Sequence, residues 1–63
     1  MSQLNTRANI VDADAFYDSL LAVHEGHTKE ESDALNARLI LLLANHIGDA
    51  AVLQEAMDKA AKS

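Results

Sequence analysis

The chain has 63 residues, no cysteine and no proline, and a formal charge of −5 from ten acidic and five basic residues. A chain of this length forms one small domain with a marginal core, because it buries only about 60% of its unfolded surface. The lack of cysteine excludes disulfides and thiolate metal sites, and the acidic balance argues against nucleic acid and against an anionic membrane as partners. Very good helix packing, self-association or a partner protein remains as the source of stability.

The start of the chain carries no recognisable targeting signal. Residues 1–11 lack the basic start and apolar run of a signal peptide, and no apolar run approaches the roughly 20 residues that span a bilayer. We therefore expect a soluble, cytoplasmic protein. Residues 1–11 are expected to form a mobile arm, with a single helical domain at 12–63. The alternative is an arm that becomes ordered on a partner through Leu4 and Ile10.

The first helix is expected at about residues 12–25. Asp12 suits the N-cap, where its carboxylate accepts a hydrogen bond from a free amide of the first turn. Val11 and Phe16 have the spacing of a hydrophobic staple across this cap. Apolar residues then share one face at three- and four-residue spacing, and Gly26 is expected to end the helix with a positive φ.

The second helix is expected at about residues 29–47. Thr28 and Glu31 match a capping box at its start, and Gly48 is expected to end it. Five consecutive aliphatic residues, Leu39–Leu43, lie inside its helical pattern. This long apolar helix is the element around which the rest of the chain is expected to be organised.

The third helix is expected to be capped by Asp49 and to span about residues 50–61, with a narrow apolar stripe. Both connecting turns are so short that neighbouring helices must fold back or bend sharply. The predicted fold is therefore all-α: a three-helix, hairpin-like mini-domain with a long apolar central helix that assembles with another chain.

Apolar residues lie on two sides of the second helix, at about 100° of rotation per residue. The wider side is expected to be covered by the other two helices; its two rows are Leu35, Leu39, Leu42 and His46, and Asn36, Ile40, Leu43 and Ile47. The other two helices are too narrow in their apolar stripes to cover the opposite side as well, so we predict that it contacts another chain, most simply in a two-fold dimer. The predicted partner-binding residues are Ala37, Arg38, Leu41, Ala44 and Asn45. The alternative is a compact monomer in which Leu41 is merely exposed, as scattered leucines often are.

Two polar residues interrupt the apolar rows of this helix. Asn36 either fixes the register of packed helices, because a buried amide needs its hydrogen-bond partners, or lies at the surface beside the first turn. Arg38 is expected in solvent or in a salt bridge, and the alternative is that it anchors an acidic group on a partner.

Three histidines are the only candidates for metal binding or acid–base chemistry. His24 and His27 flank Gly26 beside Glu25, and His46 lies in the last turn of the second helix. Their spacing is not that of HExxH, and the glycine breaks the helical face that would aim two rings at one ion, so no metal and no cofactor is predicted. No acid–base carboxylate pair, activated serine or phosphate-binding glycine loop is visible, so no catalytic activity is predicted either.

The segments LNARLILLLANHIGD and DADAFYDSLLAVHEG together resemble a family of short bacterial proteins classed only as a domain of unknown function, over about residues 5–57. The resemblance implies no catalytic residues. It implies a genomic context near flavin-dependent aromatic-ring hydroxylases and other enzymes of aromatic degradation. The predicted function is a small non-catalytic interaction protein that associates with itself or is an accessory subunit of a larger enzyme, such as a flavin-dependent aromatic hydroxylase. The alternative is a histidine-based metal- or small-ligand-binding module at an oligomer seam.

Overall fold

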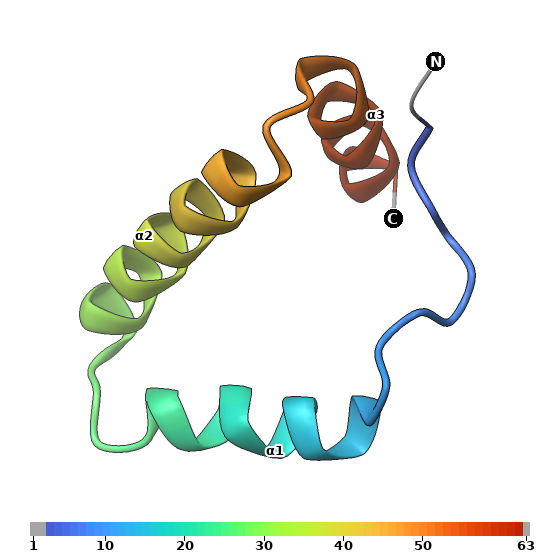
Figure 1. Cartoon of the computed structure of the whole chain (residues 1–63). Coiled ribbons are helices and arrows are strands. Elements are labelled where there is room, and N and C mark those ends of the chain that lie inside the picture. Colours follow the sequence, from blue (N-terminus) through green and yellow to red (C-terminus); the bar gives the residue numbers. More distant parts are fainter. Residues whose placement is uncertain (1–2, 63) are drawn as a thin grey trace.

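The computed structural model describes residues 3–62, which form three α-helices: α1 (Ala13–His24), α2 (Lys29–Ile47) and α3 (Ala50–Ala61) (Figure 1). These residues contain no β-strand, which confirms the all-α, three-helix fold. None of the helices that the structure describes has the length and apolar character needed to cross a lipid bilayer.

The start of α1 is capped as the sequence predicts, but the hydrophobic staple does not form. Asp12 accepts a hydrogen bond of 3.0 Å from the backbone N–H of Ala15, which satisfies one of the free amides of the first turn. Val11 is fully exposed and does not pack against Phe16, so the predicted staple is wrong. The physical reason is the path of the chain before Asp12, which leaves the end of α1 toward α3 instead of folding back over the first turn (Figure 1).

The two glycines both have positive φ, at different places relative to the helix ends. Gly48 (φ 70°) is the left-handed C-cap of α2 and its N–H donates to the carbonyl of Ala44. Gly26 (φ 79°) lies in the turn after α1, which already ends at His24 with an extended residue following it. The prediction is therefore confirmed for the end of α2, while α1 stops two residues before its glycine.

The helices form the sides of an open triangle instead of a compact hairpin (Figure 1). Within residues 3–62, no two helices pack along their lengths. The arm before α1 runs back to α3, where the backbone N–H of Leu4 donates to Glu55 Oε1 at 3.3 Å. The Cα radius of gyration is 13.4 Å, whereas a compact domain of this length has about 10.6 Å. The hairpin-like packing is absent from the single chain because both turns bend sharply and direct each helix away from its predecessor.

The part of the chain that the structure describes has no core. No residue between 3 and 62 is buried. The accessible surface is 5629 Å², compared with about 4,000 Å² for a compact monomer of this mass. Aliphatic residues in the second half of α2 remain open to solvent; they are Ile40, Leu42, Leu43 and Ile47. The prediction that α1 and α3 cover this face is wrong, because both helices meet α2 only near its ends.

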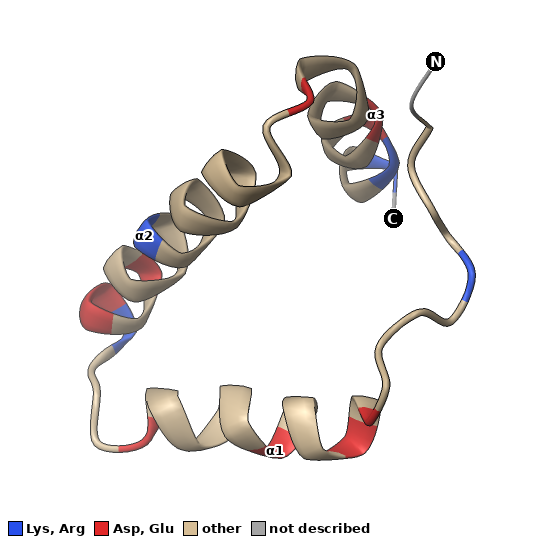
Figure 2. Ribbon diagram, viewed as in Figure 1, with Lys and Arg blue, Asp and Glu red and all other residues tan. Residues whose placement is uncertain are grey.

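Charge divides α2 into two parts (Figure 2). Its first turn contains Glu30 and Glu31, and a Lys29–Asp33 ion pair of 3.0 Å spans the first turn. The sequence from Leu39 to Gly48 has no acidic residue, lysine or arginine. The exposed leucines therefore lie on the uncharged part of the helix.

Candidate functional site: an apolar face of helix α2

A shallow, open depression of about 360 Å³ lies on α2, lined by Arg38, Leu41, Leu42 and Asn45. These four residues recur at the three- and four-residue spacing that places side chains on one face of a helix. Leu41 and Leu42 are each 70% exposed. The lining is therefore apolar at its centre and can form hydrogen bonds at both ends. We call these four residues the α2 face.

Three of the five predicted partner-binding residues, Arg38, Leu41 and Asn45, belong to the α2 face. Leu42 also belongs to it, although sequence reasoning placed Leu42 on the side covered by the other helices. Leu42 follows Arg38 by four positions and precedes Asn45 by three, so helical spacing alone places it beside them. It was not predicted as a contact residue because α1 and α3 were expected to cover it.

The remaining two predicted residues, Ala37 and Ala44, flank the α2 face. Ala37 is exposed and Ala44 is partly buried. Small side chains beside a row of leucines let another helix approach closely, because no long side chain holds the two backbones apart.

The side chain of Arg38 makes no hydrogen bond or ion pair within residues 3–62. The intrachain salt bridge that the sequence offers as one alternative is therefore absent. Its guanidinium group has five N–H donors available at the edge of the leucine surface. The α2 face thus presents an unused donor at one end and the amide of Asn45 at the other.

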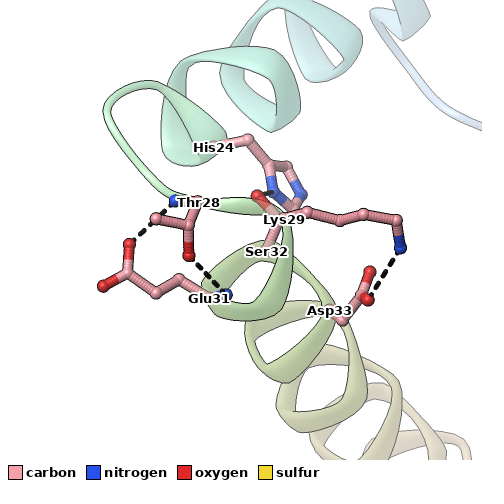
Figure 3. A network of polar contacts seen from close by, with 6 residues as sticks. All are labelled: His24, Thr28, Lys29, Glu31, Ser32 and Asp33. Atoms are coloured by element: carbon pink, nitrogen blue, oxygen red, sulfur yellow. Dashed lines mark hydrogen bonds and ion pairs between the residues drawn. The ribbon is translucent and has the colours of Figure 1, made fainter.

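A polar clamp at the corner between α1 and α2 sets the direction in which α2 leaves α1 (Figure 3). His24 Nδ1 lies 2.9 Å from Ser32 Oγ, and His24 Nε2 lies 3.0 Å from Asn36 Oδ1. Because the amide oxygen of Asn36 only accepts, Nε2 is the donor in that hydrogen bond. Asn36 is exposed, so within the single chain its role is to hold this corner and not to fix the register of a buried helix pair.

The predicted capping box completes the same corner (Figure 3). The N–H of Glu31 donates to Thr28 Oγ1 at 3.2 Å, and the N–H of Thr28 donates to Glu31 Oε1 at 2.8 Å. Each residue thereby satisfies a backbone amide that the helix leaves free. The start of α2 is fixed by local bonds that do not depend on a hydrophobic core.

The three histidines do not form a common site in the single chain. His24 and His27 lie at the corner before α2, and His46 lies in its last turn. Both ring nitrogens of His24 are engaged, and His27 Nδ1 lies 3.1 Å from the carbonyl oxygen of Glu25. In the part of the chain that the structure describes, no three His, Cys, Asp or Glu residues are placed to hold a metal ion.

In the arm before α1, the apolar side chain near the N-terminus, Leu4, is less exposed than Ile10 beside α1. Leu4 is partly buried, and its backbone is bonded to Glu55 of α3. Ile10 is 58% exposed. The arm therefore links α3 to the start of α1 within one chain, while its mobility stays a prediction.

Nearly the whole chain matches one family model, described as "Protein of unknown function (DUF2783)", over residues 4–62. This match confirms the resemblance to a domain of unknown function. No curated protein and no solved structure matches the chain. The chain belongs to the DUF2783 family of proteins of unknown function.

Proposed function

We propose that this chain is a small, non-catalytic interaction protein that docks the α2 face on another protein chain. One observation supports this most directly: no residue between 3 and 62 is buried, although 49% of the chain is hydrophobic. Folding needs buried apolar surface to offset the loss of conformational entropy. The leucines of α2 therefore need a cover that α1 and α3 do not supply.

The chemistry of the α2 face indicates which kind of partner would bind to it. Its centre, at Leu41 and Leu42, fits an apolar helix, and Arg38 adds a donor for a carbonyl, amide or carboxylate oxygen. A copy of this chain offers such a helix, and so does a larger enzyme subunit. The resemblance described above makes a flavin-dependent aromatic hydroxylase the enzyme class to test, with this chain as its accessory subunit in the cytoplasm.

Solution mass, helicity and dye binding of the untagged chain test this proposal together. Light scattering is recorded across a dilution series to low micromolar concentration, beside circular dichroism and the fluorescence of an apolar dye such as ANS. We expect either an assembly of two or more chains, or a monomer with reduced helicity that binds the dye. A fully helical monomer that unfolds cooperatively and binds no dye would overturn the proposal, because its leucines would then be covered within one chain.

A further inference from the structure

We propose that the occupant of the α2 face is a second copy of the chain, packed antiparallel about a two-fold axis that passes between Leu41 and Leu42. This inference rests on the proposed function, since it names the partner for the same surface. Three observations support it: the symmetry of the lining residues, the distribution of charge along α2, and the amount of surface that the single chain leaves exposed.

The lining of the α2 face has the same spacing in both directions along the helix. Arg38 precedes Leu41 by three positions, and Asn45 follows Leu42 by three. A two-fold interface brings the same patch of both subunits together, so it requires a patch that complements its own reversed copy. An antiparallel copy places its Asn45 opposite Arg38 and gathers the four leucines around the axis.

This arrangement also gives the Arg38 side chain a partner, which it lacks within residues 3–62 of its own chain. The guanidinium group donates hydrogen bonds, and the amide oxygen of asparagine accepts them. The two-fold axis repeats the bond at the other end of the interface. Both polar ends of the α2 face are then paired, and the leucines between them are removed from water.

The charge distribution favours the antiparallel direction over the parallel one. Each chain carries a net charge of −5, so two copies must keep their acidic segments apart. In a parallel pair the acidic first turns of α2, with Glu30 and Glu31, would lie side by side. With the axis between Leu41 and Leu42, an antiparallel pair separates these turns by roughly 30 Å along the helix, which is several times the roughly 8 Å screening length at physiological salt.

The exposed surface matches what a permanent dimer hides. The accessible surface of 5629 Å² exceeds that of a compact monomer by about 1,600 Å² per chain. Two chains that lose this excess bury about 3,200 Å² in total, within the roughly 2,000–5,000 Å² of obligate homodimers. A second copy accounts for this excess if the contact extends from the α2 face to the exposed apolar residues of α1 and α3, such as Phe16 and Met57.

A swap of the paired residues tests both the second copy and its direction. Asn45→Arg places arginine opposite arginine in the proposed dimer, so its dissociation constant should rise at least about tenfold. Adding Arg38→Asn in the same chain restores an Arg–Asn pair in reversed order, and should return the dissociation constant to within about threefold of the wild type. Analytical ultracentrifugation measures all three proteins, and circular dichroism confirms that they stay helical.

Single cysteines provide a second test, because the natural chain has none. Chains carrying Arg38→Cys and Asn45→Cys are mixed in equal amounts and oxidised in a glutathione buffer, and disulfide-linked pairs are identified by intact mass. The antiparallel dimer predicts the mixed disulfide well above its statistical share. Asp18→Cys, at an exposed position of α1, is the control and should yield few linked pairs.

The outcomes separate this inference from the proposed function. Assembly without rescue by the double swap, or with disulfides mainly between identical positions, overturns the antiparallel pair while docking through α2 stands. A wild-type monomer that binds the apolar dye overturns the second copy and points to a different protein as partner. A dye-silent, fully helical monomer overturns both.

Discussion

Replacing Leu41 by lysine is expected to dissociate the assembly while leaving α2 helical. Leu41 is 70% exposed in the single chain. Full burial of a leucine is worth about 1.5–3 kcal/mol, so covering the exposed part contributes about 1–2 kcal/mol per chain. In a two-fold dimer the loss occurs twice, about 2–4 kcal/mol, which weakens the dissociation constant roughly 30- to 700-fold. Lysine is nearly as good a helix former as leucine, so the helix itself is little affected.

Light scattering and analytical ultracentrifugation over the same dilution series measure this change. The matched control is Val11→Lys, which makes the same chemical change at a fully exposed apolar residue outside the helices. The control should leave the mass unchanged, because Val11 does not belong to the α2 face. Circular dichroism of both variants at high concentration shows whether either substitution alters helicity.

The reasoning is refuted if Leu41→Lys keeps the wild-type dissociation constant within about threefold, since even the lower energy estimate requires a larger change. Equal weakening by Val11→Lys would also refute it, because a general effect of added positive charge would then explain the loss. A variant that dissociates and retains its helix content supports the assignment of Leu41 to the interface.

Three further predictions concern the local bonds that shape the chain, each measured by urea denaturation at a constant protein concentration. Thr28→Ala removes half of the capping box and should lower the free energy of unfolding by about 1 kcal/mol. Thr28→Ser keeps the hydroxyl and should lower it much less. Equal losses of stability in the two variants would argue against a capping role for Thr28. Gly48→Ala should lower the free energy of unfolding by about 1–2 kcal/mol, because an L-residue is strained at left-handed φ. Crowding is not the cause, since the added Cβ would lie 3.7 Å from the carbonyl oxygen of Asn45. Gly48→Asn should lower it less, and an unchanged urea midpoint for Gly48→Ala would contradict the observed φ. His24→Ala removes both bonds of the corner clamp and should cost about 1–3 kcal/mol, at about 0.5–1.5 kcal/mol for each bond. His27→Ala is its control, because His27 bonds only within its own turn, and the clamp would be refuted by equal effects of the two substitutions.

Sequence patterns predicted the local structure well because each helix start depends on residues a few positions apart. Each helix has the predicted N-cap, whose side chain accepts hydrogen bonds from backbone amides of the first turn. The caps are Asp12 for α1, Thr28 with Glu31 for α2, and Asp49 for α3. These bonds form inside one turn and need no information about distant parts of the chain. Gly48 belongs to the same group, because only its own φ and the preceding helix decide its role.

The candidate surface was only partly predictable. Helical spacing placed Arg38, Leu41 and Asn45 on one side of α2, but it placed Leu42 on a side thought to be covered. Spacing orders residues around one helix, and it says nothing about which neighbouring helix reaches them. The staple at Val11 failed for the same reason, since the direction of the arm is not a property of the cap.

By itself, the sequence determined three helices, their capping residues and an excess of apolar surface on the central helix. The tertiary structure alone decided that these helices open into a triangle with no buried residue between 3 and 62. The physical reason is that these two kinds of structure depend on interactions over different distances along the chain. Caps and turns are short-range hydrogen bonds that a few residues specify, whereas a core depends on the angles between helices, and these follow from turn geometry and from contacts between residues far apart in the chain, such as His24 with Asn36 and Leu4 with Glu55.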